Sequence, residues 1–291
     1  MFKIAYNANG LRNMDVVKAI EEVKKYGYEG IELSLHKAHL HPYQVTEDKL
    51  HQIKQALKTQ NLIPACLATG CSDLLSEEAH EPSLISPVLA ERKIRIECIK
   101  KSIDIATKLN IPVVNISSGY KKETVGDEEA RRYLIEGIQE CLKEARDIIL
   151  AIEPEPGMFI ETTGQAIEII EAVQSPKFKL NMDIGHVECC EDDLLDKIRK
   201  ACKYSAHIHI EDIKSRVHYH LIPGDGDIDL RAVLEVLSSE QYEGFISVEL
   251  YHHADIYEAA LQKSYEYLNG IRKGIQNNGW DQDEEHAVSV H

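Results

Sequence analysis

The chain has 291 residues, a length that fits one large α/β domain better than a string of small ones. Its 33 Lys and Arg residues against 49 Asp and Glu residues give a formal charge of −16 with histidine neutral, and such an acidic surface argues against a general nucleic-acid-binding protein. With 43% apolar and 28% charged residues, the composition excludes an intrinsically disordered chain.

Short apolar runs of strand type alternate with segments of helical periodicity through the first half of the chain. The irregular segment 70–87 is longer than an ordinary connection, which favours a lid over a simple connector. Strands are predicted at 2–7, 30–35, 63–69 and 112–118, and helices at 15–26, 46–61, 88–110 and 127–146.

The second half of the chain repeats this alternation. The long segment 213–229 is likewise predicted to form a lid. Strands are predicted at 148–153, 178–184, 206–211 and 245–251, and helices at 163–175, 192–204, 230–239 and 256–273.

Eight consecutive βα units indicate a protein of the α/β class, a single-domain (β/α)8 TIM barrel over residues 1–275. A doubly wound open sheet is the alternative. It is less favoured because the Gly224-Asp225-Gly226 segment follows a loop and not a first strand, so it is no dinucleotide signature. Residues 276–291, rich in Asp and Glu, are predicted to form a flexible acidic tail.

The sequence lacks the features that direct a chain to a membrane or out of the cell. No apolar run approaches the ~20 residues needed to span a bilayer. The first seven residues read as a strand and lack the basic segment and apolar core of a signal peptide. The seven cysteines are odd in number and include no CxxC pair, which is typical of reduced thiols. We therefore expect a cytoplasmic protein.

Ligand-type residues lie at the ends of four predicted strands in the second half. Side chains alternate between the two faces of a strand, and this places Glu153, Asp183, His209 and Glu249 on the inward face. They fall near the C-terminal rim, where barrel enzymes carry their chemistry. The outward positions are apolar, as expected for strands covered by helices: Leu150, Ile152, Leu180, Met182, Ile208, Ile210, Ile246 and Val248.

Carboxylates crowded in a half-dry cleft repel one another and lose hydration, and a divalent cation resolves both problems. Three carboxylates and one imidazole form a donor set that suits Mn²⁺, Mg²⁺, Co²⁺ or Fe²⁺. It does not resemble a zinc site of the thiolate type. Each residue alone fits a helix cap or a rim salt bridge equally well, but four at the same height favour one metal site. We expect one divalent ion, Mn²⁺ first, with Mg²⁺, Co²⁺, Fe²⁺ or Zn²⁺ as alternatives.

Four motifs accompany these strands: Glu153-Pro, Asp183-x-x-His186, His209-x-x-Asp with a following Pro-Gly-x-Gly-x-Ile, and Glu249. Together they resemble the xylose isomerase-like barrel superfamily over about residues 1–270. Within it, the chain is similar to the sugar phosphate isomerase/epimerase group, which includes D-tagatose 3-epimerase, inosose dehydratase and the type IV apurinic endonucleases. The resemblance implies that the four residues on the inward face are metal ligands and that His186 lies near the substrate oxygen.

The sequence departs from the nuclease branch in two places. That branch adds histidines at the ends of the third and fourth strands, where this chain has Ala-Thr-Gly at 68–70 and Ile-Ser-Ser at 116–118. In the loop after the seventh strand, His218 replaces an acid while His220 keeps a histidine. A complete three-metal site is therefore not expected. His186 and His220 either hold a second metal ion or contact substrate hydroxyls or phosphate.

Epimerisation and aldose–ketose isomerisation both remove a proton next to a carbonyl, and a metal that chelates the carbonyl stabilises the enediolate. Glu153 and Glu249 are the natural acid/base pair, because carboxylates on opposite sides of the substrate can remove and return the proton. The leading hypothesis is a metal-dependent isomerase or epimerase of a sugar, sugar phosphate or polyol. A dehydratase acting on a keto-inositol or oxidised sugar is the alternative. An endonuclease-like phosphodiesterase and a non-catalytic carbohydrate-binding barrel are less favoured.

Further rim residues are candidates for substrate binding. Arg216 is either a partner for a phosphate or carboxylate or a solvated loop residue, and His36 is either a substrate contact or a surface residue. Tyr6 ends the first strand and is expected to line the pocket. Glu32 is either a buried carboxylate held by hydrogen bonds or a substrate contact. The expected partner is a small carbohydrate, not nucleic acid or a membrane, with a homodimer or homotetramer as an open alternative to a monomer.

Overall fold

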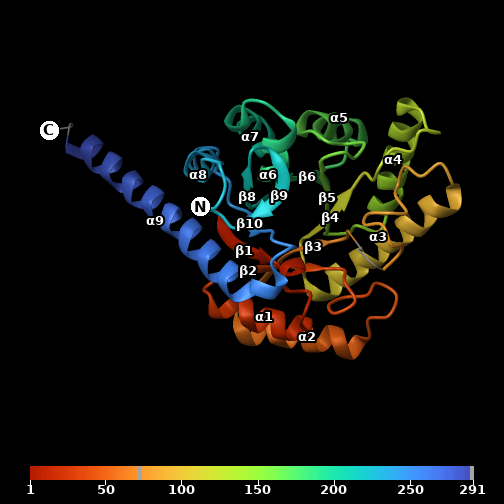
Figure 1. Cartoon of the computed structure of the whole chain (residues 1–291), viewed down its shortest axis with the longest axis horizontal. Coiled ribbons are helices and arrows are strands. Elements are labelled where there is room, and N and C mark those ends of the chain that lie inside the picture. Colours follow the sequence, from red (N-terminus) through yellow and green to blue (C-terminus); the bar gives the residue numbers. More distant parts are fainter. Residues whose placement is uncertain (71–73, 289–291) are drawn as a thin grey trace.

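Eight parallel strands close into a barrel (Figure 1). They follow one another around the barrel in chain order, and the first strand pairs with the last. The computed structural model describes residues 1–70 and 74–288. The barrel strands are β1 Lys3–Asn7, β2 Gly30–Ser34, β3 Ile63–Ala68, β4 Val113–Ser117, β5 Ile149–Glu153, β6 Phe178–Asp183, β7 Ser205–Ile210 and β10 Phe245–Val248.

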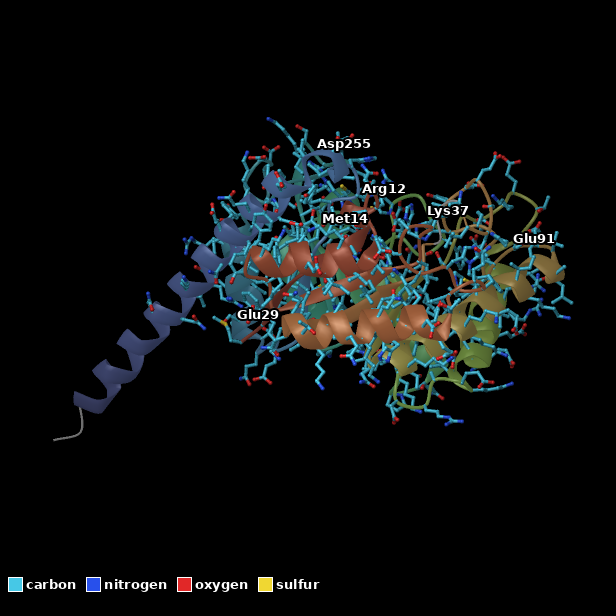
Figure 2. The ribbon with its side chains drawn as sticks, turned by 90° about the horizontal axis from the view of Figure 1, so that it is seen from below. Arg12, Met14, Glu29, Lys37, Glu91 and Asp255 are labelled. Atoms are coloured by element: carbon cyan, nitrogen blue, oxygen red, sulfur yellow. The ribbon has the colours of Figure 1, made fainter. Side chains whose placement is uncertain are left out.

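Helices cover the outside of this barrel, which confirms the predicted single-domain TIM barrel. Local sequence sets several of their ends. Asp15 caps the first helix, Thr162 and Gln165 form a reciprocal capping box on the fifth, and Asn61 ends the second in the left-handed conformation. Figure 2 shows α1 and α2 side by side across the barrel. The outer helices are α1 Val16–Lys25, α2 Glu47–Gln60, α3 Leu89–Leu109, α4 Asp127–Leu142, α5 Thr163–Val173, α7 Leu194–Cys202, α8 Leu230–Ser239 and α9 Tyr257–Val288.

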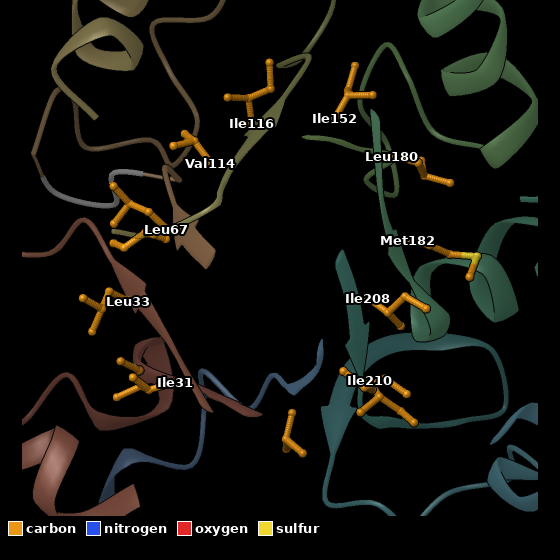
Figure 3. Packing of buried hydrophobic residues seen from close by; sticks show 14 of the residues in the cluster. Ile31, Leu33, Leu67, Val114, Ile116, Ile152, Leu180, Met182, Ile208 and Ile210 are labelled. Carbon is orange, nitrogen blue, oxygen red and sulfur yellow. The ribbon is translucent and has the colours of Figure 1, made fainter. Parts of the chain in front are cut away.

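The apolar side chains that were predicted to face outward form the layer between strands and helices. Figure 3 shows such residues as a ring around the strands, among them Ile152, Leu180 and Ile208. All eight predicted positions are at most 1% exposed. A shift of one residue would turn this apolar layer into the barrel interior, so its burial fixes which side chains reach the rim.

Short elements lie where the sequence predicts a strand end and a lid. Helix α6 Ile184–Cys190 begins directly after β6, because the side chain of Asp183 caps it by accepting from the backbone N–H of His186. The segment that was predicted as a lid after the seventh strand contains an antiparallel hairpin of β8 Asp212–Lys214 and β9 Val217–Leu221. After β1, the chain forms a single 3-10 turn, η1 Ala8–Leu11, and another, η2 Ala254–Ile256, precedes α9.

Helix α9 continues to Val288 and so includes most of the segment that was predicted to be an acidic tail. Figure 1 shows this end of the helix extending away from the barrel. That the segment 276–291 is flexible stays a prediction. No helix within residues 1–70 and 74–288 is both long and apolar enough to cross a membrane.

Candidate active site

Four ionisable residues meet at the C-terminal rim, each from a different strand. Glu153 ends β5 and Asp183 ends β6, while His209 lies near the end of β7 and Glu249 directly follows β10. Their ligand atoms all lie within 4.8 Å of one another. His209 Nδ1 is 2.8 Å from Glu153 Oε1, 3.5 Å from Glu249 Oε2 and 3.7 Å from Asp183 Oδ2. The structure thus gathers the predicted ligand residues into one group, which we call the ligand group.

The donor atoms of the ligand group fit a divalent cation. Asp183 is buried, and its Oδ2 atom makes no hydrogen bond within the described part of the chain. A buried carboxylate oxygen without a partner is costly unless a cation approaches it. Three carboxylates around one imidazole also form the oxygen-rich set that hard divalent ions prefer.

Asparagine side chains from the first half of the barrel hold the two glutamates. Asn7 and Asn9 both donate to Glu249 Oε1, at 2.9 Å and 2.8 Å. Asn115 donates to Glu153 Oε2 at 2.5 Å. Each glutamate therefore has one oxygen occupied by an amide, and its other oxygen lies toward the ligand group.

The pKa values of two cavity carboxyls are shifted in opposite directions, one mainly by a neighbouring charge and the other mainly by burial. Burial alone would raise the pKa of Glu249, but the charge and hydrogen bond of His209 hold it below its usual value. Burial raises the pKa of Glu155 to about 8, against the opposing charge of His186. Near neutral pH the site therefore contains one carboxylate that can accept a proton and one carboxyl that can donate a hydrogen bond.

A cavity of about 400 Å³ opens above the ligand group. Its volume is in the range of small-molecule sites. Among the described residues that line the cavity, Arg12 is the one that is Lys or Arg; it is labelled in Figure 2. The other polar lining residues are Asn9, Ser34, His36, His80, Asn115, Tyr120, Glu153, Glu155, His186, His218, His220, Glu249 and Tyr251.

The predicted substrate contacts divide into two groups. His36, His186 and His220 line the cavity. Tyr6 does not, because it is fully buried against the ring of Tyr28, 5.5 Å away between centroids. Arg216 also lies outside the cavity lining.

The guanidinium of Arg216 is occupied elsewhere. It donates to Asp192 Oδ1 at 2.9 Å and to the carbonyl of Glu191 at 2.7 Å. Arg12, which the sequence reasoning did not single out, is the cationic residue that borders the cavity. It follows the 3-10 turn after β1, a turn that no periodic pattern predicts.

Three histidines form a second cluster at the wall of the cavity. The hairpin of β8 and β9 carries His218 and His220, whose Nε2 atoms are 3.1 Å apart. His186 donates from Nδ1–H to the carbonyl of Pro154, 2.9 Å away, and its Nε2 atom is buried with no hydrogen-bond partner among the described residues. One ring nitrogen from each histidine lies within 4.8 Å of the others. These residues can either bind a cation or contact substrate oxygens.

Besides Arg12, the sequence did not single out the cavity residues His80 and Glu155. His80 comes from the predicted lid after β3, and its Nδ1 atom is 2.7 Å from Ser117 Oγ at the end of β4. Irregular loop sequence gives no period that would place it there. Glu155 did carry a signal, since it lies two residues beyond Glu153 in the Glu-Pro-Glu motif.

Another missed residue, Glu211, is fully buried beside Asp183 and His220. Neither of its carboxylate oxygens has a hydrogen-bond partner in the described chain, and burial together with the nearby charge of Asp183 raises its pKa well above the usual value. Gly185 leaves the space that Glu211 occupies, because a Cβ atom at position 185 would lie only 1.7 Å from Glu211 Oε1.

Comparison with known proteins relates this barrel to enzymes. A family model described as a xylose isomerase-like TIM barrel matches residues 20–270. An inosose isomerase of Halalkalibacterium halodurans is 26% identical over 261 residues, covering 86% of this chain and 88% of that protein. The L-ribulose-5-phosphate 3-epimerase UlaE of Shigella flexneri is 23% identical over 234 residues, covering 78% and 79%.

A solved structure agrees with the fold. That of the IOLI protein with a binding zinc atom superposes with a TM-score of 0.75 and 20% identity, covering 93% of this chain and 98% of that one. The match extends over nearly the whole of both chains, so the barrel architecture is shared.

Proposed function

Because the chain belongs to the xylose isomerase-like TIM barrel family, we propose that it is a divalent-metal-dependent isomerase or epimerase of a sugar, sugar phosphate or polyol-derived ketone. One observation carries the proposal. Glu153 and Glu249 reach the floor of a sugar-sized cavity from strands that have two others between them, and each is held by asparagine amides. The sequence relationship to an isomerase and an epimerase supports it. We also propose that the enzyme works in the cytoplasm.

The cation would be held by Glu153, Asp183, His209 and Glu249. When bound, it would supply positive charge that polarises the substrate carbonyl and eases removal of the neighbouring proton. Mn²⁺ is our first candidate because the donors are mostly carboxylate oxygens. Zn²⁺ remains an alternative, since the structure of the IOLI protein contains a zinc atom.

The two glutamates would move the proton. Glu249 is ionised near neutral pH, because His209 keeps its pKa low, and it can therefore accept a proton from the substrate. The amides of Asn7 and Asn9 hold its Oε1 atom in place and so limit rotation of the carboxylate. Glu153, fixed by Asn115, would carry a proton of its own and deliver it to the other face of the substrate, so that one proton leaves to Glu249 and another arrives from Glu153. A proton returned on the opposite face gives an epimer, and one moved along the same face gives an isomer.

The remaining cavity residues would bind the substrate. His36, His186 and His220 offer imidazole nitrogens to hydroxyl oxygens. Glu155, protonated near neutral pH, would donate a hydrogen bond to one of them. Arg12 lies at the edge of the cavity and would pair with a phosphate on a phosphorylated substrate.

A second cation is an alternative role for the histidine cluster. His186, His218 and His220 place three ring nitrogens close together, and imidazole nitrogens suit Zn²⁺. A cation bound here would displace the proton that nearby carboxylates favour on His186. Burial lowers the pKa of His218 to about 4, which favours its neutral, metal-binding form. This cluster does little to support the phosphodiesterase hypothesis. The nuclease branch has histidines at the ends of the third and fourth strands, where this chain has Ala68 and Ser117.

The proposal is tested by solvent exchange. Ketoses, sugar phosphates and keto-inositols are incubated with the Mn²⁺-loaded protein in D₂O, and deuterium incorporation is read by mass spectrometry. Products are identified by NMR after the Mn²⁺ is removed. An epimer or isomer with deuterium next to the carbonyl supports the proposal, and a dehydrated product supports the lyase alternative. No exchange with any member of the panel would contradict both and favour a binding protein. Glu249→Gln is the matched control, since it keeps the shape of the side chain.

A further inference from the structure

A buried carboxylate lies below the ligand group, inside the barrel. Glu32 is in the middle of β2 and is fully buried. Its Oε2 atom is 2.9 Å from His209 Nε2 and 2.9 Å from His207 Nε2, both on β7. Two other strands, β1 and β10, separate β2 from β7 around the barrel, so these hydrogen bonds cross the interior. Glu32 does not line the cavity, which identifies it as the hydrogen-bonded core carboxylate of the two roles considered from the sequence.

We propose that Glu32 is a positioning residue that fixes the ring of His209 for metal binding. The hydrogen bond from His209 Nε2–H to Glu32 leaves Nδ1 as the nitrogen that faces Glu153, Asp183 and Glu249. This inference rests on the proposed function, because it assumes that the ligand group binds a divalent cation. It assigns to strand β2, in the first half of the barrel, a direct part in building the metal site.

The ring needs such a partner because imidazole rotation is otherwise weakly restricted. The second side-chain torsion of histidine has broad minima, so packing alone defines the ring angle poorly. In His209 both nitrogens are engaged, Nδ1 with Glu153 at 2.8 Å and Nε2 with Glu32 at 2.9 Å. A rotated ring would separate both pairs. A carboxylate behind a ligating histidine also raises the basicity of the ring and commonly strengthens metal binding.

His207 provides a way to separate this role from simple stability. It touches the same Glu32 oxygen, and its Nε2 atom is also 2.9 Å from Ser247 Oγ. It has no ligand atom in the ligand group. If Glu32 only held the barrel together, weakening the bond from His207 would disturb the metal site as much as changing Glu32. If Glu32 acts through His209, the two changes should differ.

The first test compares the dissociation constants for Mn²⁺ alone, measured from the electron paramagnetic resonance signal of free Mn²⁺. We expect Glu32→Gln to weaken binding by about 10- to 100-fold and His207→Gln to leave it within about threefold of the wild type. Equal affinities for Glu32→Gln and the wild type would overturn the inference, as would an equal loss in both variants. If the wild type itself binds no Mn²⁺, the proposed function fails as well, and this outcome is distinct from the other two.

The second test does not use Glu32→Gln and so remains decisive if that variant fails to fold. Nitrogen-15 NMR of the histidine rings in the Zn²⁺-loaded wild type reports which nitrogen of His209 carries a proton. We expect Nε2 to be protonated and Nδ1 to show the chemical shift of a metal-bound nitrogen. An unprotonated or metal-bound Nε2 would overturn the inference. His209→Gln identifies the resonance by its loss.

Discussion

The two halves of the barrel rim contribute different chemistry to one site. Strands β5, β6, β7 and β10 supply the four members of the ligand group. Strands β1 to β4 supply neutral amides instead, with Asn7 and Asn115 bonded to the two glutamates, and below them Glu32 bonded to His209. One half thus provides groups that bind and transfer charge, and the other provides groups that hold them in place. The difference shows that reactive groups and their supports need not come from neighbouring strands.

Two buried histidines show how the surroundings set the charge of an imidazole ring. For His186, the charge of Asp183 overcomes the effect of burial and raises the pKa to about 9. For His39, burial lowers the pKa to about 4, although its hydrogen bond with the carbonyl of Leu11 opposes this shift. His186 is therefore favoured as a cation and His39 as a neutral ring.

The largest effect should come from removing a proton-transfer group in the second half. Glu249→Gln and Glu153→Gln should each lower the rate of solvent-deuterium exchange by about 10²- to 10⁴-fold, the usual contribution of general acid–base catalysis. Exchange into the substrate is measured by mass spectrometry, and circular dichroism checks that the variants fold. Exchange within a few-fold of the wild-type rate in both variants would end their assignment as acid and base.

A smaller loss should follow when the amide support in the first half is removed. Asn115→Ala and Asn7→Ala should lower kcat by about 10- to 100-fold, since a misplaced catalytic group costs less than a missing one. Steady-state kinetics measure the effect. Asn13→Ala is the matched control, because Asn13 also donates to a carboxylate, that of Asp255, but at the exposed surface. A loss as large as that of the glutamate variants would remove the distinction between the two halves, and no loss would show that the supports are dispensable.

The pH dependence of stability should reflect His39. Its folded-state pKa of about 4 is below the unfolded value, so the unfolded chain binds a proton first as the pH falls. The stability of the wild type should therefore decline between pH 6.5 and 4, with His39 accounting for about 1 kcal/mol at pH 5.5 relative to pH 8. Chemical denaturation at both pH values measures this. His39→Gln should lose that part of the decline, and an unchanged pH dependence would contradict the neutral ring.

The smallest effect should come from Arg216. Its exposed ion pair with Asp192 lies outside the cavity, and such surface pairs contribute about 0–1 kcal/mol. Arg216→Ala should therefore change kcat/KM less than about twofold. Arg12→Ala is the comparison, and with a phosphorylated substrate it should raise KM. If Arg216→Ala raised KM more than Arg12→Ala did, the proposal that Arg12 and not Arg216 binds the substrate phosphate would be wrong.

The sequence predicted the barrel because it depends on regular patterns. Period-two alternation in β5, β6, β7 and β10 identified both the apolar layer and the inward positions of Glu153, Asp183, His209 and Glu249. Each barrel strand was located within a few residues of its observed bounds.

The remaining parts of the site depend on contacts between distant segments, which no local pattern records. Asn9 follows β1 in a 3-10 turn and reaches Glu249, 240 residues away. His80 comes from an irregular loop, and the hairpin that brings His218 and His220 to His186 has too many polar residues to read as a strand. For Arg216 the sequence left two roles open, a phosphate partner and a solvated loop residue, and its bond to Asp192 outside the cavity agrees with the second.

The central claim is that proton exchange depends on a divalent cation in the ligand group. The most direct measurement is the rate of solvent-deuterium exchange into the substrate as Mn²⁺ is added back to chelator-treated protein. We predict no exchange without metal and a rate that rises with bound Mn²⁺, and that Asp183→Asn needs far more Mn²⁺ for the same rate. Full exchange in the metal-free protein would contradict the claim.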